Sequence, residues 1–224
     1  MKYTLLAVAL VAGICLAQAD DGCETNAVNC NALFSSVAHA ERDLEIFTNQ
    51  QLEKSFDFLL LSYVFDQYKL DRPGFEKLYR TISDKAWEDT QGLIKYRSKR
   101  GLVVELNGLQ NATDNVLETR TLKTMNRGVL LNTDEMGSLK LALAYEKALA
   151  LESHRIHKKI SHAHGEGQVY DPDVAHYLDE EIIEYQSGVI RDLTGHIHNL
   201  QSILGESTRD LGLHLFDEYL AKAQ

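Results

Sequence analysis

Four of the chain's nine histidines lie within the short stretch ESHRIHKKISHAHGEG at residues 152–167. Imidazole is a common metal ligand and the side chain that titrates nearest to neutral pH, so the stretch could bind a metal ion or sense pH. It could equally be a polar helix end that runs into a loop, because Gly165 and Gly167 close it. No cysteine accompanies these histidines, so a finger-like zinc site is not indicated.

A second set of chemically capable side chains falls on apolar helical stripes. Counting by threes and fours places Asp89, Glu146 and Gln186 beside residues that we expect to be buried. A buried carboxylate is costly unless it is paired, so these groups either reach solvent, hydrogen-bond one another, or mark a present or degenerate metal site inside a helical bundle. Carboxylate-bridged di-iron bundles also need Glu-x-x-His pairs, and the sequence contains none. A complete centre of that type is therefore not expected.

The elements that must position these residues are long helices. Both prolines lie where helices are expected to begin, and Asp71 and Asp171 are the candidate caps beside them. Short turns join the first helix to the second and the third to the fourth, while residues 100–134 form a long crossover. The predicted apolar stripes are Leu44, Phe47, Leu52, Phe56, Leu59, Tyr63; Phe75, Leu78, Ile82, Ala86, Leu93, Tyr96; Leu139, Leu143, Leu149, Ile156, Ile160; and Val174, Leu178, Ile182, Val189, Leu193, Ile197, Leu200.

The N-terminus predicts the compartment. Lys2, an apolar run from Leu5 to Leu16 and the small-x-small sequence Ala17-Gln18-Ala19 are typical of a secretory signal peptide at 1–19. The run is shorter than the roughly 20 residues of a membrane-spanning helix, so no membrane insertion is expected. In an oxidising compartment Cys23 and Cys30 should form disulfides, with each other or with another chain. Asn111 opens the sequon Asn-Ala-Thr and is a candidate glycosylation site.

Several segments resemble ferritins, in particular the secreted light-chain homologues of insects. These are SYVFDQYKLDRPGFEKLYR at 62–80, YRSKRGL at 96–102, LAYEKAL at 143–149, YDPDVAHYLDE at 170–180 and LHLFDEYL at 213–220. The resemblance implies an all-α, ferritin-like four-helix bundle with a long crossover between the second and third helices and a short fifth helix. The expected organisation is a signal peptide at 1–19, a cysteine-containing extension at 20–37, and a ferritin-like domain at 38–224, with the bundle to about 204 and the fifth helix at about 207–221.

The resemblance also implies where a ferroxidase centre would lie. The family's catalytic heavy chains use Glu and Tyr on the first helix, Glu and His on the second, Glu on the third and Gln on the fourth. The corresponding residues here are Gln51, Phe58, Ala86, Asp89, Glu146 and Gln186. Glu146 and Gln186 keep the family's residue type, and the other four do not. Phe58 and Ala86 have no ligating oxygen, so Asp89, Glu146 and Gln186 are interpreted as the remnant of a centre without activity.

Two further iron-handling sites follow from the resemblance. The family's threefold pores correspond to His157, His176 and Asp179, where a ring repeated by symmetry could pass divalent cations. His157 is thus the member of the histidine-rich stretch that keeps a functional hypothesis. The family's mineral-nucleating face corresponds to Asp84 and Glu88, interrupted by lysines, so a plain solvated helix face is an equal alternative.

The resulting hypothesis is a non-catalytic, light-chain-type subunit of a secreted iron-storage cage of about 24 subunits, shared with a heavy chain that oxidises Fe²⁺ to the Fe³⁺ of the mineral. One alternative is a ferroxidase with an atypical centre around Glu146, Asp89 and Gln186. Another is a secreted four-helix protein without iron. A net charge of −10 disfavours nucleic acid as a partner and favours cations.

Overall fold

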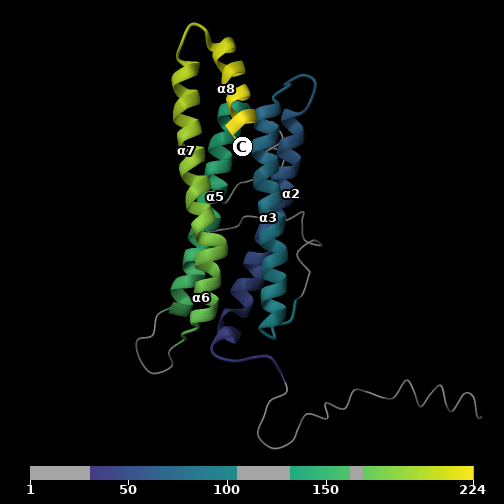
Figure 1. Cartoon of the computed structure of the whole chain (residues 1–224), viewed down its shortest axis with the longest axis vertical. Helices are drawn as coiled ribbons and strands as arrows, with labels where there is room; N and C mark the ends of the chain where they lie inside the picture. Colours follow the sequence, from purple (N-terminus) through teal and green to yellow (C-terminus); the bar gives the residue numbers. More distant parts are fainter. Residues whose placement is uncertain (1–30, 105–131, 162–168, 224) are drawn as a thin grey trace, which may run out of the picture. The chain divides into compact units, whose positions relative to one another are not determined.

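The computed structural model describes residues 31–104, 132–161 and 169–223, and these residues fold into helices (Figure 1). The helices belong to one compact unit, Leu33–Gln224. In chain order they are a 3-10 turn η1 (Val37–Ala40), α2 (Glu41–Phe65), α3 (Pro73–Lys99), α5 (Glu135–Ser161), α6 (Pro172–Leu178), a π-helical turn η3 (Asp179–Ile183), α7 (Glu184–Leu204) and α8 (Arg209–Ala223).

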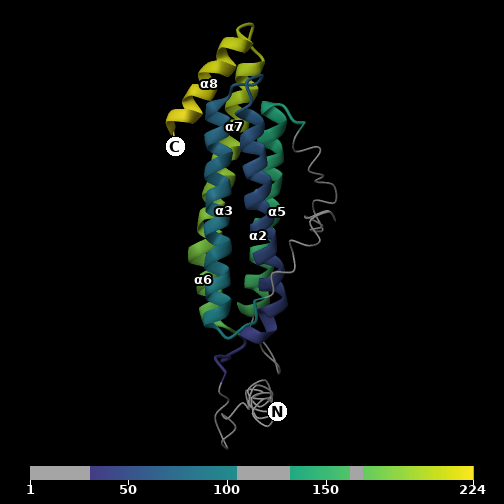
Figure 2. The same cartoon turned by 90° about the vertical axis from the view of Figure 1, so that its right-hand side faces the viewer.

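The long helices form a four-helix bundle. Helix α2 runs antiparallel to α3, and α5 runs antiparallel to the continuous helix made by α6, η3 and α7 (Figures 1 and 2). Because α3 and α5 run in the same direction, the end of α3 and the start of α5 lie at opposite ends of the bundle, about 40 Å apart for a helix of this length. Residues 105–131 of the connection between them lie outside the described residues. Helix α8 folds back against α3 and α7. The predicted fold class is thereby confirmed.

The first apolar stripe was predicted in the wrong phase. Leu44 and Phe47 are buried as expected, but Phe56 and Tyr63 are 48% and 50% exposed. Helix α2 instead buries a face that contains polar residues, and the core is completed by apolar residues further along it. That face comprises Leu44, Phe47, Gln51, Lys54, Phe58, Leu61 and Phe65. The second stripe, on α3, is buried at every predicted position.

The two proline-linked helix starts are capped differently. The Asp171 carboxylate accepts a hydrogen bond from the Val174 N–H at 3.1 Å, as predicted. At α3 the N-cap is Arg72 and gives no side-chain cap, so the prediction for Asp71 is wrong. Asp217 of α8 accepts from the Gly74 and Phe75 N–H groups at 3.0 and 3.1 Å instead. The close approach requires Gly74, because a Cβ there would lie 1.9 Å from the Asp217 carbonyl oxygen.

A buried arginine joins three segments at the other end of the bundle. The Arg100 guanidinium pairs with the Asp171 carboxylate at 2.8 Å, and both side chains are at most 1% exposed. It also donates to the Tyr96 hydroxyl at 2.8 Å and to the Phe34 carbonyl at 3.2 Å, and it contacts Asp173. The Phe34 ring packs against the guanidinium at 4.1 Å. Arg100 thus joins the segment before η1, the C-terminal end of α3 and the N-terminal end of α6.

None of the helices in the described ranges combines the length and the hydropathy needed to span a bilayer.

The π-helical turn η3 has no counterpart in the sequence-based prediction, which places one regular helix there. One extra residue in this turn changes the direction in which the side chains before and after it point.

Candidate functional site

The middle of the bundle has a polar interior to which all four long helices contribute. Gln51 and Lys54 come from α2, Asp89 from α3, Glu146 from α5 and Gln186 from α7. All five side chains are buried. The predicted inward orientation of Asp89, Glu146 and Gln186 is therefore confirmed, and the solvent-reaching alternative is wrong.

A lysine pairs with the glutamate of this interior. The Lys54 ammonium lies 2.6 Å from Oε1 of Glu146, and the two side chains are 1% and 0% exposed. The contact is an ion pair, and neither Glu146 oxygen forms a well-aligned hydrogen bond within the described residues. A buried carboxylate needs a cation beside it, and here the protein supplies that cation from its own chain.

The amides beside this ion pair are poorly satisfied. The Gln186 Oε1 accepts a hydrogen bond from the Ser153 hydroxyl at 2.8 Å, whereas its Nε2 has no partner among the described residues. Neither the oxygen nor the nitrogen of the Gln51 amide has a hydrogen-bond partner among the described residues. Buried polar atoms without partners are uncommon and require an explanation such as bound water or a lost ligand.

Asp89 pairs with a different lysine from the one that pairs with Glu146. Its carboxylate pairs with Lys85 one turn earlier on α3, and the Lys85 ammonium lies 4.9 Å from the centre of the Tyr185 ring. Burial raises the pKa of Asp89, and the hydrogen bond and charge of Lys85 offset only part of that effect. Asp89 and Glu146 are therefore each neutralised by a separate lysine.

Positions that would have to supply further metal ligands are apolar. Phe58 packs edge-on against the Tyr145 ring, with 5.4 Å between centroids, and Ala86 is completely buried. The Tyr145 hydroxyl donates to Asp57 at 3.3 Å, so this phenol is already engaged. Across residues 31–104, 132–161 and 169–223, no three His, Cys, Asp or Glu side chains are grouped so that they could hold a metal ion.

The predicted pore residues are partly brought together. His157 Nε2 of α5 lies 3.2 Å from the Asp179 carboxylate in η3. His176 is 68% exposed and lies 3.2 Å from the carboxylate of Glu180, a residue that the sequence-based prediction did not include. These contacts form two adjacent imidazole–carboxylate pairs on the α5 and α6–η3 side of the bundle. His154 is exposed and contacts its own helix at the Ala150 carbonyl, and His162 and His164 lie outside the described residues.

The other predicted residues lie on the surface of α3 or outside the described residues. Asp84 and Glu88 are exposed one turn apart on α3. Cys23, Cys30, Asn111 and the signal peptide at 1–19 lie outside the described residues. The residue that sequence reasoning missed is Lys54. Its spacing of three from Gln51 and four from Phe58 was the available signal for its inward direction.

Comparison with known proteins identifies the family. No protein-family model matches the chain. The chain is 34% identical to a ferritin light chain of Drosophila melanogaster over 99% of its length and 100% of the relative's, and 31% identical to a ferritin light chain of Trichoplusia ni over 99% of both. Its fold matches the crystal structure of Trichoplusia ni secreted ferritin with a TM-score of 0.75 and 30% identity, over 92% of this chain and 95% of that one. The chain therefore belongs to the ferritin family and is a homologue of secreted insect-type ferritin light chains.

Proposed function

We propose that the protein is a light-chain-type subunit of a secreted ferritin cage that stores and transports iron as a ferric mineral. The named light-chain relatives and the match to a secreted ferritin support this role. In the proposed cage this subunit contributes to the shell, and a heavy-chain partner oxidises Fe²⁺. The signal peptide at 1–19, a disulfide through Cys23 or Cys30 and a glycan on Asn111 are the accompanying proposals for the secreted form.

The observation that carries the non-catalytic role is the buried Lys54–Glu146 ion pair. An ammonium group in contact with Glu146 repels a divalent cation and occupies one of its carboxylate oxygens. Oxidation of Fe²⁺ by paired metals needs several hard oxygen ligands held around both ions. Phe58 and Ala86 supply none, and Asp89 is paired with Lys85. These contacts also disfavour the alternative of an atypical ferroxidase centre.

Iron oxidation by defined assemblies tests this role. The purified chain, alone and assembled with an insect ferritin heavy chain, is given Fe²⁺ in air, and the initial rate of Fe³⁺ formation is recorded. The chain alone should match the protein-free rate, and the mixed assembly should oxidise iron in proportion to its heavy-chain content. Rapid, saturable oxidation by the chain alone would contradict the proposal, as would a native complex that contains neither iron nor other subunits.

The two imidazole–carboxylate pairs support a proposed entry route for divalent cations. His157 lies beside Asp179 and His176 beside Glu180, so symmetry-related copies could form a ring of nitrogen and oxygen ligands. Assemblies that carry both His157→Ala and His176→Ala should take up Fe²⁺ several-fold more slowly. Once the Fe²⁺ concentration inside the cage is the same, they should oxidise it at the same rate as the original assembly. His154→Ala, exposed on the same helix as His157, is the matched control and should take up iron normally. Unchanged uptake in the double variant would reject the route.

A further inference from the structure

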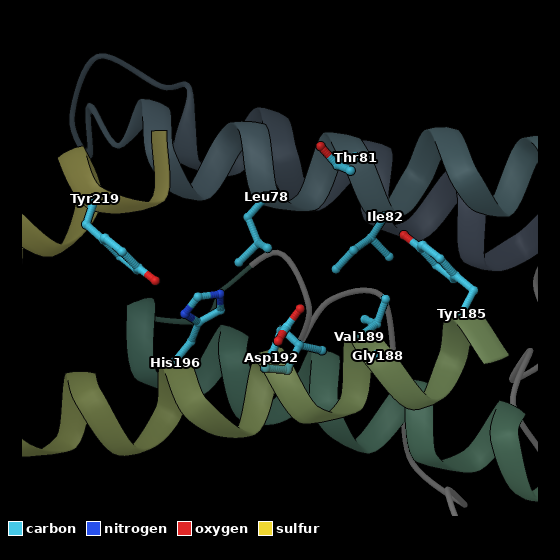
Figure 3. A pocket seen from close by; sticks show the side chains of 10 residues that line it. Leu78, Thr81, Ile82, Tyr185, Gly188, Val189, Asp192, His196 and Tyr219 are labelled. Atoms are coloured by element: carbon cyan, nitrogen blue, oxygen red, sulfur yellow. The ribbon is translucent and has the colours of Figure 1, made fainter. Parts of the chain in front are cut away.

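A cleft of about 490 Å³ lies between α3, α7 and α8, and its Tyr185 end borders the Lys85–Asp89 contact (Figure 3). Its walls are apolar along the middle, where Leu78 and Ile82 of α3 face Val189 of α7. Asp192 and His196 of α7 and Tyr219 of α8 also line it. The function proposed above uses none of these three side chains.

The three side chains follow one another along the cleft, from Asp192 near its middle through His196 to Tyr219 at one end (Figure 3). Asp192 and His196 are four residues apart on one helix and so project from the same face. The His196 and Tyr219 rings lie almost perpendicular, with 6.1 Å between their centroids, and Figure 3 shows the phenol pointing from α8 towards the imidazole. Carboxylate, imidazole and phenol thus come from two helices that pack against each other.

Each donor is available to a cation. Burial lowers the pKa of His196, and the charge of Asp192 opposes only part of that effect, so the imidazole is neutral at pH 7 and has a free lone pair. Asp192 pairs with Arg191 at 3.0 Å, but both side chains are mostly exposed, and such an ion pair holds its partner weakly. Tyr219 is 51% exposed, so a cation can reach its hydroxyl from solvent.

We propose that Asp192, His196 and Tyr219 bind a ferric ion in this cleft. A carboxylate and a phenolate are hard, anionic oxygen donors that suit a small trivalent cation, and imidazole is a common additional ligand of iron. On binding, the phenol releases its proton to solvent, and the remaining coordination positions are filled by water. The assignment of the cation as iron rests on the proposed function. The ligand set differs from the carboxylates of Asp84 and Glu88, because it includes a phenol.

A visible spectrum tests the site, because phenolate bound to Fe³⁺ gives a charge-transfer band that carboxylates do not. Fe³⁺ is added as its nitrilotriacetate complex to the purified full-length protein, at up to one ion per chain. The band should appear and saturate, and Tyr219→Phe should abolish it. Tyr185→Phe is the matched control, because it removes a phenol that lines the other end of the same cleft, and this variant should keep the band.

The remaining ligands are tested by affinity. Asp192→Asn and His196→Gln should each weaken the binding that produces the band by about tenfold or more. No band in the unmodified chain, an equal band in Tyr219→Phe, or its loss in Tyr185→Phe would each overturn the site. These results are independent of the oxidation assay: a native complex without iron would refute the proposed function even if the purified chain showed the band.

Discussion

Two buried ion pairs of this bundle have similar exposure and very different surroundings. At the Arg100 junction the guanidinium and the Asp171 carboxylate share hydrogen bonds with Tyr96, the Phe34 carbonyl and the Val174 N–H. In the polar interior, Lys54 and Glu146 contact each other beside amide atoms of Gln51 and Gln186 that have no partner among the described residues. The first pair is tied to several neighbouring groups, and only the Arg100 Nε lacks a partner among the described residues of that junction. The second is surrounded by buried polar atoms that have no hydrogen-bond partner among the described residues.

The largest effect is expected from breaking the Arg100 junction. Arg100→Met leaves the Asp171 carboxylate buried without its cation and removes the bond to Phe34, so the free energy of unfolding should fall by about 3–5 kcal/mol. Urea denaturation measures the change. The matched control is Arg191→Met, whose side chain is exposed and should change stability by less than about 0.5 kcal/mol. Equal, small effects in both variants would show that the junction is not structural.

The interior pair should respond differently to single and double substitution. Glu146→Gln leaves the Lys54 ammonium buried without a carboxylate and should cost about 3 kcal/mol of unfolding free energy. Adding Lys54→Met removes that charge as well, and the double variant should be as stable as the original chain or more stable by about 1–4 kcal/mol. The same denaturation assay measures both. A double variant less stable than the single one would show that the interior pair is structural, like the junction.

The smallest effect is a difference in acid response. Burial acts to raise the pKa of Asp171, but hydrogen bonds from Arg100 and the Val174 N–H outweigh it, so the pKa lies below its ordinary 3.8. The stability that Asp171 contributes is therefore present above pH 3.8 and lost as pH falls through the lowered value. Asp89 has a raised pKa, so its ionisation costs stability as pH rises from 3.8 through the raised value.

Denaturation midpoints at about pH 3 to 6 separate the two carboxyls. Asp171→Asn should be less stable than the original chain near pH 6, and this difference in stability should shrink as the solution is made more acidic. Asp89→Asn should become relatively more stable as pH rises across the same window. Asp84→Asn on the exposed face of α3 serves as the control and should follow the original chain. Parallel curves for Asp171→Asn and Asp89→Asn would remove this distinction between junction and interior.

The sequence was sufficient for the buried face of α3 and insufficient for that of α2. On α3 every predicted apolar position is buried, and the polar residues that share this face, such as Asp89, lie in phase with the apolar stripe. On α2 the large apolar residues Phe56 and Tyr63 point outwards, while Lys54 points inwards. A lysine can be buried only because Glu146, 92 positions later in the chain, lies against it, and one helix's periodicity contains no information about that partner.

The same reason explains the other differences. Glu146 and Gln186 could be placed from their position on the stripes and from the family resemblance. The cap of α3 could not, because Asp217 reaches it from a helix near the end of the chain. The pairing of Glu180 with His176 has the ordinary helical spacing of four residues, so a local pattern could have predicted it. The π-helical turn itself had no such signal.

The cap of α3 by Asp217 has a consequence for the order of folding. Gly74 and Asp217 are 143 positions apart, so their hydrogen bond closes a loop that includes most of the chain. During synthesis α2 and α3 leave the ribosome long before α8 exists, and the first turn of α3 must wait for its cap. The last helix to be made thus completes one of the first, and a ribosome that stops before residue 217 leaves α3 with a frayed start.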